Sequence, residues 1–289
     1  MAGNLQTIKD IRNYLGNELG NIFPQEEIVS LTRVVLISVL KIDRIRILID
    51  DCAPVVSPEH ATRIKEISER LKTREPLQYI LGETIFYDCR IKVNPSVLIP
   101  RPETEELVEL VINENRGFCG KLTDACTGSG CIAIALAVKF KEASISGFDL
   151  SQEAISLAVR NAELNNVKVS FCQADIFDIQ ACNINKTDII VSNPPYVRNS
   201  EKKAMRRNVL DFEPHEALFV PDDDPLIFYK AILKLAGEML DSGGKIYFEI
   251  NEAMGSDMID LLRSYNYTET AIYKDINGKD RIVKGYKNG

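Results

Sequence analysis

Apolar residues recur at helical spacing through the first 82 residues of the chain. One stripe consists of Leu5, Ile8, Ile11, Leu15 and Leu19. Residues three or four positions apart lie on one face of a helix, so this stripe predicts an amphipathic helix. The same spacing predicts further helices over residues 24–40, 58–71 and 76–81. We expect these helices to form a small bundle.

The pattern changes after residue 82. Residues 84–87 and 90–93 are rich in β-branched and aromatic side chains on either side of Asp88-Cys89, which predicts a hairpin. From Pro100 onward, predicted strands and helices alternate. The strands are expected over residues 121–125, 144–148, 167–173, 188–191, 245–250, 268–273 and 281–286, and the helices over residues 102–115, 130–140, 152–165, 226–240 and 254–264. Such alternation predicts an α/β fold with a mostly parallel sheet covered by helices on both faces.

These patterns divide the chain into three parts. We expect a helical domain over residues 1–82, a linking β-hairpin over residues 83–98 and an α/β domain over residues 99–289. In an open α/β sheet, ligands bind at the carboxyl ends of the strands.

Composition restricts the class of protein. The 289 residues are 45% hydrophobic and 27% charged, which is typical of a soluble globular protein. The net charge of −7, from 35 basic and 42 acidic residues, argues against stable binding to nucleic acid. No run of about 18 apolar residues predicts a membrane span. The first residues lack the pattern of a signal peptide, so we expect a cytoplasmic protein.

Cysteine and histidine usage favours neither disulfides nor a metal site. The seven cysteines, at positions 52, 89, 119, 126, 131, 172 and 182, are odd in number and contain no Cys-x-x-Cys motif. This predicts reduced thiols. The two histidines, His60 and His215, are far apart in the sequence, and no cluster of metal ligands is visible.

The first candidate site follows a short apolar run, residues 189–192. It reads Asn193-Pro194-Pro195-Tyr196, and proline cannot continue a central strand. The Pro194 carbonyl and the Asn193 side-chain oxygen form two neighbouring acceptors, and Tyr196 adds a flat ring. Such a pair suits a planar NH2 group of an amide or an exocyclic amine. The alternative is an ordinary turn, which Asn-Pro often begins.

The second candidate site is a glycine-rich turn after the first predicted strand of the α/β domain. It consists of Cys126, Thr127, Gly128, Ser129 and Gly130. Glycine lets the backbone approach a ligand closely. Asp149 ends the next strand, where its carboxylate can accept both hydroxyls of a ribose. Ile176 follows the third strand, in a position to flank an adenine.

Together these residues predict a nucleoside site. The turn also fits a dinucleotide fingerprint, although a dehydrogenase does not explain Asn-Pro-Pro-Tyr. An ordinary tight turn, with Asp149 as a helix cap, is the remaining alternative.

The motifs resemble those of class I S-adenosylmethionine-dependent methyltransferases, and the whole chain is similar to the HemK/PrmC family of protein-(glutamine-N5) methyltransferases. The segments that carry the resemblance are residues 74–82, 98–105, 124–131, 193–196, 212–214 and 278–283. Asn-Pro-Pro-Tyr is shared with DNA adenine methyltransferases. The Ile-Pro-Arg-Pro-Glu-Thr-Glu segment, residues 99–105, is what makes the resemblance specific.

The resemblance implies a Rossmann-like, seven-stranded, mostly parallel sheet and S-adenosyl-L-methionine as the cofactor. It implies methyl transfer to the glutamine of the Gly-Gly-Gln motif of peptide-chain release factors, by a monomer whose amino-terminal helices recognise the substrate. Asn193 and Pro194 would be catalytic, and Pro195 and Tyr196 would also bind substrate. The cofactor would contact Cys126, Thr127, Gly128, Ser129, Gly130, Asp149, Ile176 and Asn193. No metal is implied.

One departure from the family pattern matters. Cys126 stands where the family usually has glycine. If this position has a positive φ, a cysteine costs about 1 kcal/mol of strain. Two alternatives remain: an adenine-N6 methyltransferase of DNA or RNA that uses the same acceptor pair, and a non-catalytic cofactor-binding protein that Cys126 has made inactive. The former predicts a basic face and a target-recognition insert, and the sequence shows neither.

Overall fold

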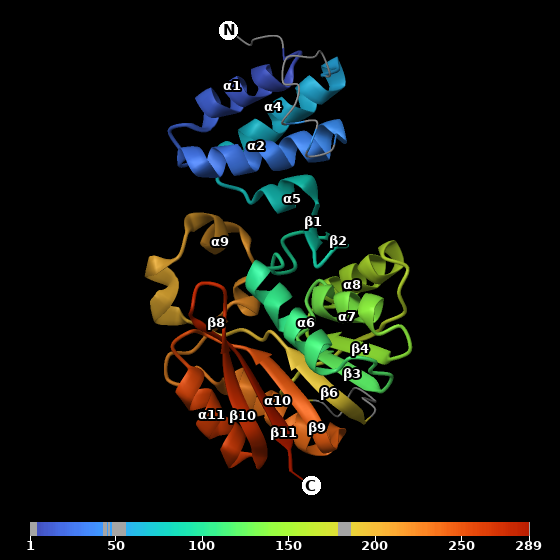
Figure 1. Ribbon diagram of the computed structural model, residues 1–289. Helices are drawn as coiled ribbons and strands as arrows, with labels where there is room; N and C mark the ends of the chain where they lie inside the picture. The colour runs from blue at the N-terminus through green and yellow to red at the C-terminus, as the bar shows by residue number, and fades with distance from the viewer. Residues whose placement is uncertain (1–4, 43–44, 46, 48–55, 179–185, 289) are drawn as a thin grey trace. The chain divides into compact units, whose positions relative to one another are not determined.

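The computed structural model describes residues 5–42, 45, 47, 56–178 and 186–288 (Figure 1). Close contacts group Met1–Gly82 with Arg206–Phe212 in one unit, and Glu83–Met205 with Glu213–Gly289 in the other. The stretch 206–212, expected from the sequence to belong to the α/β domain, thus groups with the amino-terminal helices. Cys52 and Cys182 lie outside the described residues, and the cysteines within them are free thiols. Among the described helices, none is both long and apolar enough to cross a membrane.

The first unit is a bundle of helices, as the sequence predicts. Its helices are α1 (Ile8–Leu19), α2 (Gln25–Leu40), α4 (Pro58–Lys72), α5 (Leu77–Leu81) and α9 (Arg207–Phe212). Ser57 caps α4 by accepting a hydrogen bond from the backbone N–H of His60. The predicted stripe of α1 is buried, because Ile8, Ile11, Leu15 and Leu19 are all 0% exposed.

The second unit begins with the predicted hairpin. Its strands are β1 (Glu83–Phe86) and β2 (Cys89–Lys92), with Phe86 opposite Cys89. The turn is therefore Tyr87-Asp88, one residue earlier than predicted. Both turn residues have positive φ, 46° and 65°, as a two-residue hairpin turn requires.

A seven-stranded sheet forms the centre of the second unit, in the order β10-β11-β9-β6-β3-β4-β5. The strands are β3 (Lys121–Ala125), β4 (Ser144–Asp149), β5 (Ser170–Gln173), β6 (Thr187–Ser192), β9 (Leu240–Glu249), β10 (Tyr267–Lys274) and β11 (Asp280–Lys287). β11 runs antiparallel to both of its neighbours, and the pairs from β9 to β5 are parallel. The predicted sheet is confirmed. Its strand order reverses between β3 and β6, which is where such sheets bind ligands.

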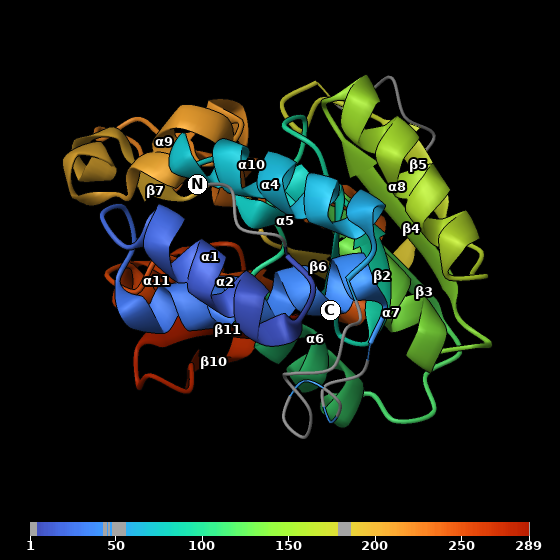
Figure 2. The same ribbon diagram turned by 90° about the horizontal axis from the view of Figure 1, so that it is seen from above.

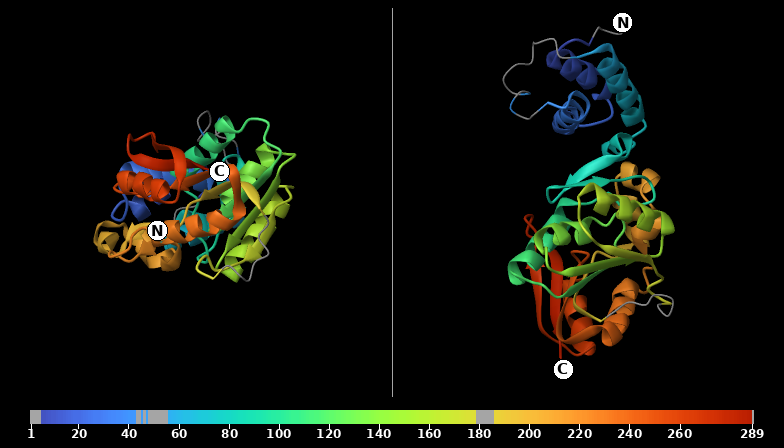
Figure 3. Two further views of the ribbon diagram at one scale, coloured as in Figure 1. Left: turned by 90° about the horizontal axis from the view of Figure 1, so that it is seen from below. Right: turned by 90° about the vertical axis from the view of Figure 1, so that its right-hand side faces the viewer.

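Helices cover both faces of this sheet. They are α6 (Pro102–Glu114), α7 (Cys131–Lys139), α8 (Gln152–Leu164), α10 (Ile227–Met239) and α11 (Gly255–Ser264). α8 lies along β4 and β5, as Figure 2 shows. α7 contacts both α6 and α8, and α10 and α11 lie on the opposite face (Figure 3). Residues of α10 and α11 share a buried apolar cluster with strands of the sheet, including Tyr229, Ile232, Ile246 and Phe248.

The segment between β6 and α10 is more structured than the sequence predicts. It contains β7 (Val197–Arg198), η2 (Asn199–Ala204), η3 (His215–Ala217) and β8 (Phe219–Val220), besides α9. β7 and β8 pair in parallel. A strand of two residues carries no recognisable periodicity, so the apolar pattern gives no sign of it.

Candidate active site

The predicted site residues follow neighbouring strands at one edge of the sheet. Ala125 of β3 pairs with Phe148 of β4 and with Ser192 of β6, and Ser192 pairs with Phe248 of β9. The next residue on each strand is therefore Cys126, Asp149, Asn193 and Glu249, respectively. All four lie at the carboxyl ends of parallel strands.

The loop after β3 is shaped by three residues with positive φ. Cys126, Gly128 and Gly130 have φ angles of 60°, 53° and 80°. A Cβ atom on Gly130 would lie 3.0 Å from the Cβ of Ala158, whereas one on Gly128 would have no atom within 4 Å. Gly130 therefore allows α8 to pack closely, while the backbone at Gly128 stays open to a ligand.

The same loop is fixed to its surroundings at two further residues. The backbone N–H of Thr127 donates to the Phe148 carbonyl of β4 at 2.9 Å. The Ser129 carbonyl accepts a hydrogen bond of 2.9 Å from Nδ2 of Asn161, a fully buried residue of α8. Asn161 also bonds the backbone N–H and carbonyl of Lys92 in the hairpin, at 2.8 and 3.0 Å. One side chain thus holds the loop and the hairpin together.

Asp149 is oriented by backbone donors. Its Oδ2 accepts from the N–H of Gly128 at 2.8 Å and its Oδ1 from the N–H of Ser151 at 3.0 Å. Ser151, and not Asp149, caps α8 by accepting from the N–H of Ala154. Burial raises the pKa of the Asp149 carboxyl, and the backbone donors oppose this effect. Each oxygen keeps a lone pair for a further donor.

Asp124, the fourth residue of β3, is a polar group that the sequence analysis left unassigned. It is 0% exposed, and its Oδ2 accepts from the Thr127 hydroxyl at 2.5 Å and the Ala133 N–H at 3.2 Å. Burial raises the pKa of this carboxyl to about 7. Its Oδ1 is buried and has no hydrogen-bond partner among the described residues. The sequence signal for a role of Asp124 is an acidic residue just before a glycine-rich turn.

The residues after β5 differ in exposure. Ile176, expected to flank an adenine, is 9% exposed and belongs to the apolar cluster of the sheet. Its neighbour Phe177 is 54% exposed and packs against the Phe228 ring at 5.2 Å between centroids. Leu150, directly after Asp149, is 57% exposed. Leu150 after β4 and Phe177 after β5 therefore offer open apolar surface, whereas Ile176 is buried in the cluster.

The Asn-Pro-Pro-Tyr segment directly follows β6. Pro194 and Pro195 are buried, and Asn193 and Tyr196 are half-buried. Nδ2 of Asn193 donates to Oγ1 of Thr104 at 3.1 Å. Within the described part of the chain, no donor forms a hydrogen bond with the Asn193 side-chain oxygen or the Pro194 carbonyl. The two predicted acceptors are thus both uncommitted.

Two buried residues lie behind this segment, and the sequence alone predicts a role for neither of them. Thr104 of α6 donates its hydroxyl proton to Oε2 of Glu249 at 2.6 Å, and the Tyr196 hydroxyl donates to Oε1 at 2.8 Å. Thr104 is 2% exposed and Glu249 1%. Burial raises the pKa of Glu249, and the two hydroxyls and the positive charge of Arg281 oppose this. The Tyr196 ring packs against the apolar cluster.

Comparison with known proteins assigns both parts of the chain to described domains. Residues 18–82 match the family described as the PrmC N-terminal domain, and residues 103–211 match the methyltransferase small domain. A protein of Flavobacterium psychrophilum named release factor glutamine methyltransferase is 42% identical, over 96% of this chain and 98% of its own length. This chain belongs to the release factor glutamine methyltransferase family.

Other members of the release factor glutamine methyltransferase family support this assignment. The namesake from Bacteroides thetaiotaomicron is 43% identical, over 94% of this chain and 98% of its own length. Among solved structures, a methyltransferase from Pyrococcus furiosus superposes with a TM-score of 0.51, at 16% identity, over 81% of this chain and all of that one. That similarity concerns the fold, which is that of class I methyltransferases.

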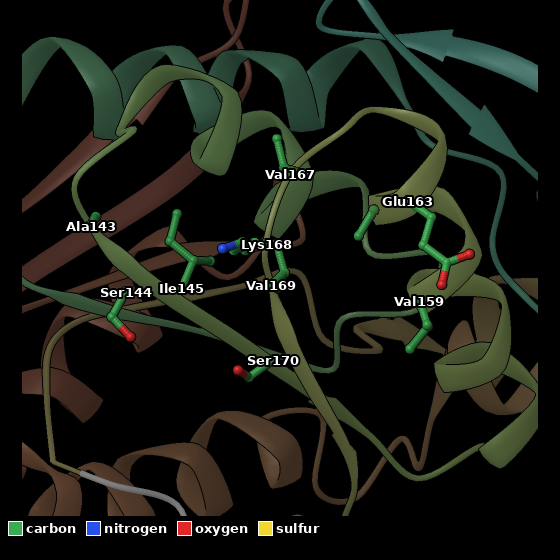
Figure 4. Close-up of a pocket in the computed structure, with 10 residues that line it drawn as sticks. Ala143, Ser144, Ile145, Val159, Glu163, Val167, Lys168, Val169 and Ser170 are labelled. Atoms are coloured by element: carbon green, nitrogen blue, oxygen red, sulfur yellow. The ribbon is translucent and has the colours of Figure 1, made fainter.

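A separate pocket lies at the other end of the sheet (Figure 4). It has a volume of about 410 Å³ and is lined by the first residues of β4 and β5 and by α8. Ser144, Ile145, Val159, Glu163 and Ser170 are among its lining residues. None of the candidate site residues contributes to it, so the site described above is distinct from this pocket.

Proposed function

We propose that this protein transfers a methyl group from S-adenosyl-L-methionine to the side-chain amide nitrogen of a glutamine in peptide-chain release factors, in their Gly-Gly-Gln motif, and thereby tunes translation termination. The observation that carries the proposal is the pair of uncommitted acceptors, Asn193 Oδ1 and the Pro194 carbonyl, at the carboxyl end of β6. Membership of the family supplies the substrate class.

The residues around the β3 and β4 ends fit S-adenosylmethionine. The Asp149 carboxylate is held by two backbone donors and can accept from ribose hydroxyls. The exposed side chains of Leu150 and Phe177 can cover the faces of an adenine. Oδ1 of Asp124 is buried without a partner and suits a cationic amine donor. We assign the backbone of residues 126–130 and Asp149 to cofactor binding, with Asp124 added.

The protein contributes to the reaction by aligning the glutamine nitrogen with the methyl group. When bound, the cofactor supplies a methyl group made electrophilic by the adjacent sulfonium. The glutamine nitrogen is a weak nucleophile, because its lone pair is delocalised into the carbonyl. Asn193 and Pro194 accept its two N–H groups, which turns the lone pair toward the methyl.

Positive charge develops on the nitrogen as the new N–C bond forms and the S–C bond breaks. Both hydrogen bonds strengthen with that charge, so they stabilise the transition state more than the bound substrate. The methylated nitrogen then loses one proton to water, and no side-chain base is needed. We assign Pro195, which is buried, and the Tyr196 ring, which packs against the apolar cluster, to binding of the substrate amide.

We further propose that the protein acts as a cytoplasmic monomer that forms no stable complex with nucleic acid or membrane. The net charge of −7 supports the absence of nucleic acid. The amino-terminal helices are assigned to recognition of the release factor. Light scattering of the purified chain, alone and with the release factor, tests the monomer.

Mass spectrometry of a release factor's Gly-Gly-Gln peptide tests the function, after incubation of the release factor with the protein and S-adenosylmethionine. A gain of one methyl group on the glutamine is expected. Methylation of adenine in DNA or RNA, with the glutamine unchanged, would favour the adenine-N6 alternative. Cofactor binding by calorimetry with no methylation of either substrate would favour a non-catalytic cofactor-binding protein.

A further inference from the structure

The Asn193 side chain must present its oxygen, and not its nitrogen, to a substrate amide. A primary carboxamide has two ends of nearly equal size, so a half-turn about its last bond exchanges acceptor for donor. In the flipped orientation, Asn193 would point an NH2 group at the NH2 group of the substrate. The orientation of this one side chain therefore decides whether the acceptor pair exists.

The hydrogen bonds behind Asn193 fix this orientation. Oγ1 of Thr104 lies 3.1 Å from Nδ2 of Asn193 and 2.6 Å from Oε2 of Glu249. A hydroxyl has one proton to donate, and a carboxylate can only accept. The Thr104 proton is therefore directed to Glu249, so Thr104 faces Asn193 with a lone pair. Only the NH2 end of Asn193 can meet that lone pair.

In its ionised form, Glu249 cannot reverse the chain of donors. Its second oxygen accepts from the Tyr196 hydroxyl at 2.8 Å, and its backbone carbonyl accepts from the Tyr229 hydroxyl at 2.9 Å. Thr104, Glu249 and Tyr229 are buried, so water does not compete freely for these groups. The hydroxyl protons of Thr104, Tyr196 and Tyr229 are thus all directed to Glu249.

We propose that Thr104 and Glu249 are positioning residues for methyl transfer, which set the polarity of a Glu249–Thr104–Asn193 hydrogen-bond chain and thereby aim Oδ1 of Asn193 at the substrate amide. This role rests on the proposed function. It gives a role to an acidic residue that is buried behind Asn193, although neither Thr104 nor Glu249 contacts the reacting atoms.

The direction of the Glu249–Thr104–Asn193 hydrogen-bond chain can be reversed by two substitutions that together leave the total charge unchanged. In Asn193→Asp, two carboxylates compete for the single Thr104 proton, so methyl transfer should fall. In the double variant Asn193→Asp/Glu249→Gln, the new amide at position 249 donates to the Thr104 hydroxyl, which then donates to the new carboxylate at position 193. The other oxygen of that carboxylate faces the substrate as an acceptor, and the amide oxygen at position 249 still accepts from Tyr196.

The kinetic test measures kcat and KM for the release factor in the wild type, the two single variants and the double variant. The double variant should have a kcat roughly ten times that of Asn193→Asp. This kcat should also exceed the value expected from adding the free-energy effects of the two single changes. A double variant whose kcat does not exceed this additive expectation would overturn the proposal. Thr104→Val should lower kcat roughly tenfold with little change in KM, while Thr104→Ser retains activity.

Thr123→Val is a matched control. Thr123 is also a buried threonine of this unit, 3% exposed, and its hydroxyl lies 3.1 Å from that of Ser146. It should keep the wild-type kcat. Equal losses of kcat in Thr123→Val and Thr104→Val would assign the effect to folding and overturn the proposal.

A second measurement does not depend on activity. In ¹⁵N-labelled protein, the side-chain NH2 signal of Asn193 is identified by its loss in Asn193→Ala. Its hydrogen exchange should be slow in the wild type and roughly tenfold faster in Thr104→Val, with no change in Thr123→Val. Failure of the proposed function would appear as no methyl transfer by the wild type, with this exchange pattern intact. Unprotected exchange in the wild type would overturn the orientation itself.

Discussion

Arg101 forms an ion pair with Glu213, which lies 112 residues further along the chain. Nη2 of Arg101 is 2.5 Å from Oε1 of Glu213, and the Glu213 side chain is 1% exposed. The second carboxylate oxygen accepts from the backbone N–H of Ile99 at 3.2 Å. Glu103 is an acidic residue much nearer to Arg101 in the sequence, but the partner of Arg101 is Glu213. The pair ties the segment before α6 to the segment after Asn-Pro-Pro-Tyr.

Arg101→Ala is therefore expected to destabilise the protein more than Glu213→Gln. The first leaves a buried carboxylate unpaired, which costs about 3 kcal/mol. The second keeps an acceptor for Ile99 and removes the charge, so a loss of about 1 kcal/mol is expected. Urea denaturation of both variants measures the difference in the free energy of unfolding. An equal or smaller loss in Arg101→Ala would show that the pair contributes no net stability.

Asp149→Ala is expected to weaken cofactor binding much more than it slows methyl transfer at saturating cofactor. Charge-assisted hydrogen bonds to ribose hydroxyls contribute about 1.5–3 kcal/mol, so Kd should rise about 10- to 100-fold. Calorimetry with S-adenosylhomocysteine measures this change. Ser151→Ala, which removes the α8 cap, is the control and should leave Kd within about threefold of the wild type. Unchanged affinity in Asp149→Ala would contradict its assignment.

Cys126 has a φ of 60°, in the left-handed region that favours glycine. Cys126→Gly and Cys126→Ala both remove the thiol, and they differ only in this backbone freedom. The Cys126→Gly protein should therefore be more stable than the Cys126→Ala protein by about 1 kcal/mol, which is the reverse of the order in a helix. Thermal unfolding of the two variants measures this difference in stability, and cofactor-induced stabilisation should persist in both. A more stable alanine variant would refute the strain at this residue.

Asp124 predicts a dependence of stability on pH. Its pKa is about 7 in the folded protein, above the ordinary value of 3.8, because of burial. The folded state retains a proton that the unfolded chain releases, so this stabilising contribution is complete below about pH 4 and is lost as pH rises through about 7. Relative to Asp124→Asn, the free energy of unfolding of the wild type should fall by about 1.4 kcal/mol per pH unit in that window. Urea denaturation at several pH values tests this, and a constant difference would contradict it.

The sequence predicted the fold and the strand-end residues because both follow from local patterns. Apolar runs and alternation place Asp149 and Asn193 at the ends of parallel strands, and parallel strands end at one edge. Thr104 and Glu249 form one hydrogen bond across 145 residues, and no local pattern connects them. The inward orientation of Ile176 and the exposure of Phe177 depend on how the chain leaves β5, which alternation alone does not determine.

The central claim is that Asn193 aligns a glutamine amide for methyl transfer. Mass spectrometry of the Gly-Gly-Gln peptide, after incubation of a release factor with S-adenosylmethionine and either wild type or Asn193→Ala, tests it most directly. We expect methylated glutamine with the wild type and a rate about a hundredfold lower with the variant, because an oriented contact to the transition state contributes about 3 kcal/mol. Unfolding curves and cofactor affinity should match the wild type. A folded, cofactor-binding Asn193→Ala protein with near wild-type activity would contradict the account.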